Sequence, residues 1–202
     1  MSTNKELDPY SAQAESHNVS PQEKIDGLRA IVKSVKTGML ASRSASGEIH
    51  SRAMAPAGPV EHNQVSLIFI GNRVTHKFDE IENDSHVNVS FYDPSTTNWA
   101  SYAGRARISQ DKELIAKHWS HLVAAWFGDL GDGVHKGDQN DPRVAVIEVI
   151  PDQIRYWVSN RGTVGRAVDV AYSAATGNTA SPGELRTITE DEIQLVQGMT
   201  SK

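Results

Sequence analysis

The spacing of the apolar residues changes at Gly38, and this change constrains the fold more strongly than any other feature of the sequence. Before it, apolar side chains recur at helical spacing over residues 25–35, behind a helix start at Ser20-Pro21-Gln22-Glu23. After it, apolar and polar residues alternate in short runs, which is typical of strands that bury one face. We therefore expect one helix followed by a mainly antiparallel β-sheet.

The alternating runs predict six to seven strands. The first two flank a hairpin turn at Ser46-Gly47, and Gly104 is expected to form a bend or bulge in the fifth. A short helix is expected near Thr75, and a second, after Asp111, should bury a face that includes Leu122. Residues 128–142 are predicted to form a polar loop. The predicted strands cover residues 39–42, 49–54, 65–69, 87–91, 98–109, 145–149 and 154–158.

The length of 202 residues suits a single domain, and 38% apolar residues can supply its core. Residues 1–19 are polar and lack periodicity, so we expect a flexible N-terminal arm. Residues 20–160 hold the predicted sheet. Residues 161–202 are expected to form a C-terminal helical extension: a helix, a loop and a final helix with Thr189 and Glu192 as its capping box. This order favours a closed antiparallel barrel decorated by helices, or an α+β fold.

Composition excludes several functional classes. The net charge of -5 argues against a general nucleic-acid binder, which needs a basic face. The absence of cysteine excludes disulfides, thiolate nucleophiles and iron–sulfur clusters.

His118 and His121 are spaced like a metal-binding pair, but no third ligand stands near them, so we expect surface histidines and no metal site. No apolar run approaches the ~20 residues of a membrane span, so we expect a soluble, cytoplasmic protein.

Two features suggest a site for an anion. Thr75-His76-Lys77 begins a short helix after a strand, where free backbone N–H groups and the helix dipole favour a phosphate. The alternative is a threonine N-cap followed by two exposed polar residues. Arg52 lies inside an alternating strand, where its guanidinium could bind a phosphate or could simply face solvent.

Five stretches together carry a resemblance to a known family: GMLASRSASGEIHSRAM (38–54), SLIFIGNRVTHKFDEIENDSHVNVSFYDP (66–94), WASYAGRARISQD (99–111), AAWFGD (124–129) and IRYW (154–157). In order and spacing they resemble the FMN-binding split-barrel proteins related to pyridoxamine 5'-phosphate oxidase. The chain is most similar to the general stress protein branch and to its blue-light-induced fungal members. The resemblance covers roughly residues 20–160. It implies a six- to seven-stranded antiparallel split β-barrel with flanking helices.

The resemblance also implies a set of cofactor-binding residues. In this family an arginine of the second strand reaches the FMN phosphate, and the backbone after it meets the flavin ring. A serine-arginine-lysine motif at the next helix start completes the phosphate site, and here a histidine replaces its arginine. The strand from residue 99 approaches the flavin across the dimer interface, and an aromatic residue after it lies by the partner's flavin. The residues so implied are Arg52, Ala53, Met54, Phe69, Ile70, Thr75, His76, Lys77, Trp99, Ser101 and Trp126.

The family resemblance implies FMN, or alternatively FAD, as the cofactor, and a homodimer with flavin sites at the subunit interface. True pyridoxamine-phosphate oxidases carry a substrate-phosphate lysine shortly after the flavin-binding arginine. Here that stretch is Ala55-Pro56-Ala57-Gly58, which has no cation, so we do not expect that activity. Ile70 and Gly71 also stand where the family often has an aromatic residue and a threonine against the flavin.

Three functions therefore remain open. The first is an FMN-dependent oxidoreductase of unknown substrate, with NADH or NADPH as the electron donor. The second is a non-catalytic flavin-binding stress protein that stores or senses FMN, which the missing lysine favours slightly. The third is a cofactor-free dimeric scaffold. No side chain identifies itself from the sequence as a catalytic acid or base.

Overall fold

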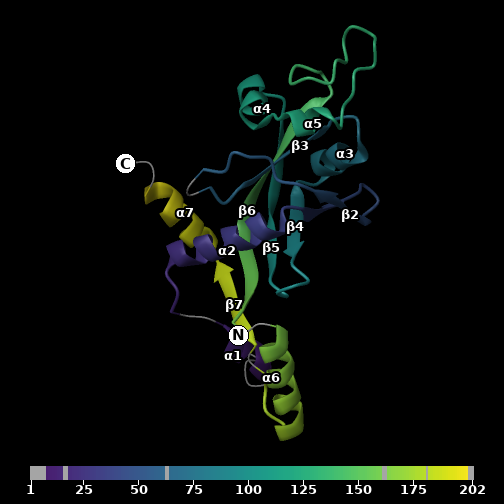
Figure 1. Cartoon of the computed structure of the whole chain (residues 1–202). Coiled ribbons are helices and arrows are strands. Elements are labelled where there is room, and N and C mark those ends of the chain that lie inside the picture. Colours follow the sequence, from purple (N-terminus) through teal and green to yellow (C-terminus); the bar gives the residue numbers. More distant parts are fainter. Residues whose placement is uncertain (1–7, 16–17, 62–63, 161–162, 181, 200–202) are drawn as a thin grey trace.

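The computed structural model describes residues 8–15, 18–61, 64–160, 163–180 and 182–199 (Figure 1). Its strands are β1 (Gly38–Arg43), β2 (Ile49–Met54), β3 (Leu67–Asn72), β4 (His86–Tyr92), β5 (Trp99–Ser109), β6 (Val144–Ser159) and β7 (Gly183–Ile188). Its helices are α1 (Pro9–Ala14), α2 (Pro21–Val35), α3 (His76–Asn83), α4 (Lys112–His118), α5 (His121–Ala124), α6 (Thr163–Thr176) and α7 (Glu190–Met199). Among these described helices, none combines the length and hydropathy that a membrane crossing requires.

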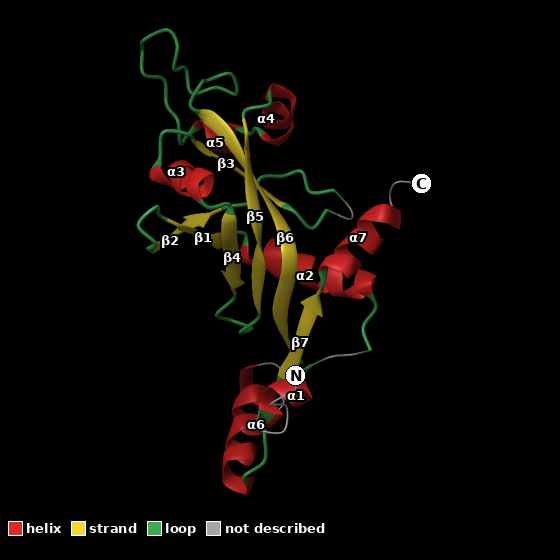
Figure 2. Cartoon of the chain, turned by 180° about the vertical axis from the view of Figure 1, so that it is seen from behind, coloured by secondary structure: helices red, strands yellow, loops and turns green. Residues whose placement is uncertain are grey.

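The described strands form one antiparallel sheet. Its order is β2-β1-β4-β5-β6-β3, and β7 pairs with β6. The long strands β5 and β6 run through the middle of a strongly curled sheet, with helices placed around it (Figure 2). This curled half-barrel confirms the predicted mainly β split barrel with flanking helices.

Helix α2 crosses one face of the sheet and begins as the sequence predicts (Figure 1). The Ser20 hydroxyl accepts the Glu23 N–H at 3.3 Å, and the Glu23 carboxylate accepts the Ser20 N–H at 3.0 Å. This reciprocal capping box satisfies two N–H groups that the helix itself leaves unpaired. Ile25, Leu28 and Ile31 face the core and are buried, as their helical spacing indicates.

The N-terminal end of α2 is also tied to the C-terminal part of the chain. Lys24 forms an ion pair with Glu192 of α7 at 2.7 Å and donates to the Thr187 carbonyl of β7 at 2.9 Å. The Tyr156 hydroxyl of β6 donates to the Lys24 carbonyl at 2.7 Å. Elements far apart in sequence therefore hold α2 against the sheet.

Helix α3 begins directly after Thr75, in agreement with the prediction. The Thr75 hydroxyl donates to the Asn72 carbonyl at 2.7 Å and does not accept from a helix N–H. Phe78 and Ile81 are buried, as predicted. Their burial sets the rotation of the helix and places Glu80 against β1 and β2.

One long strand, β6, stands where the sequence predicted two. It continues through Pro151 because the register between β5 and β6 shifts at Ala103 and Gly104, opposite this proline. A proline that cannot donate to the ladder is accommodated at such an irregularity. A Cβ at Gly104 would lie 2.2 Å from the Ile150 carbonyl oxygen, so the close approach requires glycine. The predicted bulge is confirmed, and the predicted break between residues 149 and 154 is wrong.

Part of the predicted N-terminal arm is helical. Asp8 caps α1 by accepting the Ser11 N–H, and Pro9 occupies the first turn, a start signal that the polar composition concealed. Ala14 is buried in a small cluster with Trp157 and Leu185. Residues 1–7 and 16–17 of the arm lie outside the described residues.

Two further elements differ from the prediction. Residues 183–188, expected in a loop, form β7, because Leu185 and Ile188 find buried positions beside β6. The single helix predicted after Asp111 is two helices, since Ser120 accepts the Val123 N–H and caps a separate α5. As a consequence Leu122 is 82% exposed instead of buried. The predicted helix after residue 162 and the capping box of Thr189 with Glu192 are confirmed.

Candidate functional site

Arg52 and Lys77, two of the residues predicted to bind an anion, come near each other where β1, β2 and α3 meet. Arg52 lies opposite Leu40 in the β1–β2 ladder, on the face of the hairpin that α3 covers. Lys77 is close enough to Arg52 for the charge of the guanidinium to lower its pKa. We call this group the corner; it consists of Ser42, His50, Arg52, Thr75, Lys77 and Glu80.

The guanidinium of Arg52 is already paired within the protein. Its Nη2 donates to Glu80 Oε2 at 2.6 Å, and its Nη1 donates to Ser42 Oγ at 2.5 Å and to the Leu40 carbonyl at 3.3 Å. The side chain is 24% exposed. Arg52 therefore does not simply face solvent, and its remaining exposed edge is held in a fixed direction.

Glu80 is the buried centre of the corner. Its carboxylate accepts hydrogen bonds from Ser42 and Arg52 and lies 2.6 Å from Nδ1 of His50. Burial acts to raise the pKa of Glu80, but the bonds from Ser42, His50 and Arg52 outweigh it and lower the pKa to about 2. Glu80 is thus ionised at neutral pH, and it orients the guanidinium of Arg52.

Lys77 has a different environment from Arg52. Its Nζ donates to Thr75 Oγ1 at 2.6 Å and lies 5.4 Å from the centre of the Phe78 ring. No carboxylate of the described residues pairs with it. Burial lowers the pKa of Lys77, and the charge of Arg52 lowers it further, against a smaller opposing effect of Glu80. The corner therefore holds two cations, Arg52 and Lys77, but only the carboxylate of Glu80, which leaves it with an excess of positive charge.

Gly71 allows Lys77 to lie close to β3. A Cβ at Gly71 would lie 3.2 Å from Cε of Lys77 and 3.3 Å from the Phe78 ring. His76, by contrast, has a fully exposed side chain whose nearest described partner is Asp79, at 3.8 Å. The structure therefore brings Thr75 and Lys77 into the corner but leaves His76 outside it.

Sequence reasoning missed Ser42, His50 and Glu80. Ser42 and His50 stand opposite each other in the β1–β2 ladder, on the same face as Arg52. One signal was available for Glu80. An arginine inside a strand needs a partner when it is partly buried, and Glu80 is the first acidic residue on the inward side of the next helix.

Four predicted residues lie on the strands around the corner. Ala53 is exposed on the opposite face of β2, and Met54 is half-buried against the core. Phe69 is fully buried in the core, so only its backbone is available to a ligand. Ile70 is half-buried and packs against the second apolar cluster, beneath α4 and α5.

Three predicted residues have no hydrogen bond, ion pair or ring contact with the corner in the described part of the chain. Trp99 packs against the cluster of Trp157 at the far end of β5. Ser101 accepts a hydrogen bond from Asn88 at 2.8 Å. Trp126 follows α5 and is 85% exposed.

The predicted surface position of His118 is wrong. His118 ends α4 and is only 3% exposed, and its Nδ1 lies 3.1 Å from the Gly58 carbonyl oxygen. Because α4 and α5 are separate helices, His121 does not share its face. Among the described residues, no three His, Cys, Asp or Glu side chains gather closely enough to hold a metal ion.

The chain is similar to two curated proteins. Protein bli-3 of Neurospora crassa is 40% identical over 192 residues, which cover 95% of this chain and 91% of the relative. General stress protein 26 of Bacillus subtilis is 32% identical over 123 residues, which cover 59% of this chain and 78% of the relative.

The fold is shared with solved structures. A crystal structure from Nostoc punctiforme, described as a pyridoxamine 5'-phosphate oxidase-related, FMN binding protein, matches with a TM-score of 0.53 at 15% identity. The match covers 85% of this chain and 97% of the Nostoc chain. Residues 23–181 match the family described as pyridoxamine 5'-phosphate oxidase like. With the curled antiparallel sheet and these relatives in agreement, the chain belongs to the pyridoxamine 5'-phosphate oxidase-like family.

Proposed function

We propose that the corner receives the phosphate of FMN and that the protein is an FMN-dependent oxidoreductase. One observation carries the proposal: Lys77 lies beside Arg52 with no carboxylate of its own among the described residues. The two cations repel each other, and a bound phosphate would relieve that repulsion while pairing with both. The family membership and the FMN-binding relative support this choice of anion.

The residues of the corner suit a phosphate group. Arg52 offers the exposed edge of an oriented guanidinium and Lys77 an ammonium, and the Thr75 hydroxyl positions that ammonium by accepting a hydrogen bond from it beside the start of α3. Such a helix start also presents free N–H groups to an anion. A bound FMN would supply two-electron chemistry through its ring, and Ala53, Met54 and Ile70 are the residues that we expect next to that ring.

The proposal includes a homodimer with the flavin at the subunit interface. Leu122 and Trp126 are 82% and 85% exposed and lie four residues apart around α5. Large apolar side chains exposed together are typical of an interaction surface. In the dimer, Trp126 would lie beside the flavin of the partner, and Trp99 and Ser101 would approach it across the interface.

Calorimetric titration tests the phosphate site. Arg52→Ala and Lys77→Ala should each weaken FMN binding by about 1.5–3 kcal/mol, the range for hydrogen bonds to charged groups. Riboflavin lacks the phosphate, so its affinity should not change in Lys77→Ala. His76→Ala serves as a matched control and should have a smaller effect. FAD, titrated in parallel, establishes which flavin is preferred. Parent-like FMN binding in both variants would show that the site is misplaced.

Anaerobic reduction separates the proposal from its alternative. NADH or NADPH should bleach the bound flavin if the protein is an oxidoreductase. The alternative, a stress protein that stores or senses FMN, is favoured by the absence of a cation in residues 55–58, and it predicts that the bound flavin stays oxidised. A colourless protein that takes up no added flavin would leave only a cofactor-free scaffold.

Sedimentation equilibrium tests the dimer. We expect a dimer of the parent chain at micromolar concentration and a weaker dimer for Trp126→Ser, because the change removes an exposed aromatic side chain from the proposed interface. Lys112→Ser, an exposed change on the neighbouring α4, serves as the control. A monomeric parent protein would contradict this part of the proposal.

A further inference from the structure

A cavity lies between α2, the chain that follows β2, and the start of β3. Its volume is about 420 Å³, within the range of small-ligand sites. Its wall is mostly apolar and includes Leu28 and Val32 of α2, Ala57, and Val65 and Leu67. None of the corner residues lines it.

Tyr102 of β5 also lines this cavity, and its hydroxyl is left without a partner. The residue is only 2% exposed, and its ring packs edge-on against the ring of Phe91, with 5.9 Å between the two ring centres. No described residue donates a hydrogen bond to the hydroxyl or accepts one from it. Buried phenols nearly always find a hydrogen-bond partner. Burial raises the pKa of Tyr102, against a smaller opposing effect of Arg29, so the hydroxyl keeps its proton and can donate.

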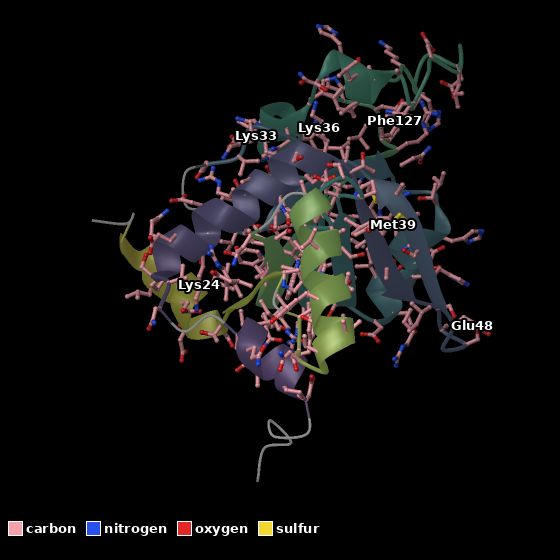
Figure 3. All side chains as sticks on the ribbon, turned by 60° about the horizontal axis from the view of Figure 1, so that its bottom comes forward. Lys24, Lys33, Lys36, Met39, Glu48 and Phe127 are labelled. Carbon is pink, nitrogen blue, oxygen red and sulfur yellow. The ribbon has the colours of Figure 1, made fainter. Side chains whose placement is uncertain are left out.

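The charged residues that line the cavity are all basic. They are Arg29, Lys33 and Lys36, and none of the described lining residues is acidic. Lys33 and Lys36 lie at the same end of α2 (Figure 3), are exposed, and form no ion pair with any described residue. Arg29 donates to the Glu61 carbonyl at 3.0 Å. Cations near a helix C-terminus are favoured by its dipole. That effect explains the position of the lysines but not the unpartnered hydroxyl of Tyr102.

We propose that this cavity binds a small apolar carboxylate that carries an uncharged oxygen at its far end. The apolar body would fill the space between α2 and β3. The carboxylate would stay at the mouth with Lys33 and Lys36, because placing it inside would strip its water without a cation to replace it. The uncharged oxygen would reach Tyr102 and accept its hydrogen bond. The cavity shares no residue with the corner, so this inference does not rest on the proposed function.

Fluorescence titration with three related probes tests the inference on the full chain. The first is a hydroxynaphthoate, with its hydroxyl and carboxylate at opposite ends of the fused rings. The other two are naphthoate, which lacks the hydroxyl, and naphthol, which lacks the carboxylate. The parent protein should bind hydroxynaphthoate most tightly, because that probe alone engages both ends of the cavity.

Two variants test which side chains bind the hydroxyl and the carboxylate of the probe. Tyr102→Phe keeps the ring and should weaken hydroxynaphthoate binding roughly tenfold, the effect of one buried hydrogen bond, while naphthoate changes less than about twofold. The double change Lys33→Gln with Lys36→Gln should weaken both carboxylates and leave naphthol unchanged. Both variants should retain the parent's unfolding midpoint within a few degrees, since none of the three side chains has a described polar partner to lose.

The outcomes that overturn the inference are distinct from those that bear on FMN. No binding of any probe at millimolar concentration, or equal hydroxynaphthoate affinity in the parent and Tyr102→Phe, refutes the site. Displacement of the probe by FMN would place it in the flavin site instead and also refute the inference. Lys77→Ala should leave probe binding unchanged, and Tyr102→Phe should leave FMN affinity unchanged.

Discussion

The buried polar groups of the corner and of the cavity beside α2 have opposite environments. In the corner, the carboxylate of Glu80 is buried, but it accepts hydrogen bonds from Ser42 and Arg52 and lies against His50. In the cavity, the hydroxyl of Tyr102 is buried and has no partner among the described residues. The protein itself therefore satisfies the first group and leaves the second for a ligand.

This difference makes it possible to distinguish the effect of a substitution on folding from its effect on ligand binding, both at the corner and in the cavity. A side chain that partners others inside the fold cannot be removed without cost, whether or not a ligand binds. A polar atom without a partner contributes little to folding, so its removal should show mainly in binding. The stability of variants is therefore as informative here as their affinity.

The largest expected effect is that of Glu80→Ala. Removing this carboxylate leaves the partly buried Arg52 without its ion pair, and it should lower the free energy of unfolding by about 3 kcal/mol. Urea unfolding of the parent and the variant measures the difference. Glu82→Ala, on the exposed side of the same helix, is the control and should change stability by less than about 0.5 kcal/mol. A similar, small loss in both variants would show that the corner does not depend on Glu80.

The second expected effect is a dependence on pH. The pKa of Glu80 in the folded protein, about 2, lies below its ordinary value near 4.5, so its contribution to stability is complete above the ordinary value. That contribution is lost as the pH falls toward 2. Between pH 5 and pH 3 the difference in stability between the parent and Glu80→Gln should shrink by about 2 kcal/mol. A difference that stays constant over this range would contradict the assigned ionisation.

The smallest expected effect is that of Tyr102→Phe on stability. At neutral pH the variant should unfold within about 0.5 kcal/mol of the parent, because no hydrogen bond is lost. Burial raises the pKa of Tyr102, so the neutral phenol contributes stability that is complete below the ordinary pKa near 10 and is lost above it. Unfolding measured from pH 7 to 11 should therefore show the parent losing stability relative to the variant above pH 10. A large loss at neutral pH would mean that the hydroxyl has a partner after all.

The sheet could be predicted because period-two alternation follows directly from the geometry of a strand. The prediction failed where tertiary contacts override a local signal. Pro151 marks the end of a strand in isolation, but the bulge opposite it at Gly104 lets β6 continue. Residues 183–188 show no clear alternation, and β6 alone supplies the ladder that makes them a strand.

The candidate site was predictable only in part. Arg52, Thr75 and Lys77 could be named because each residue type stands in a position that suits an anion. Glu80 could not be assigned from its type, since an acidic residue in a short helix is usually exposed. Its role depends on the rotation that Phe78 and Ile81 impose on α3. The unpartnered hydroxyl of Tyr102 leaves no trace in a sequence at all.

Because α2 is attached to the C-terminal part of the chain, a substitution can change the cavity without changing the corner. Lys24 holds the helix to Thr187 and Glu192, both beyond residue 181, where the match to the family ends. The corner is built wholly from segments within that match. A substitution in the tail can therefore tilt the wall of the cavity and retune its selectivity while the corner keeps its shape. Divergence among relatives can act on one site and spare the other.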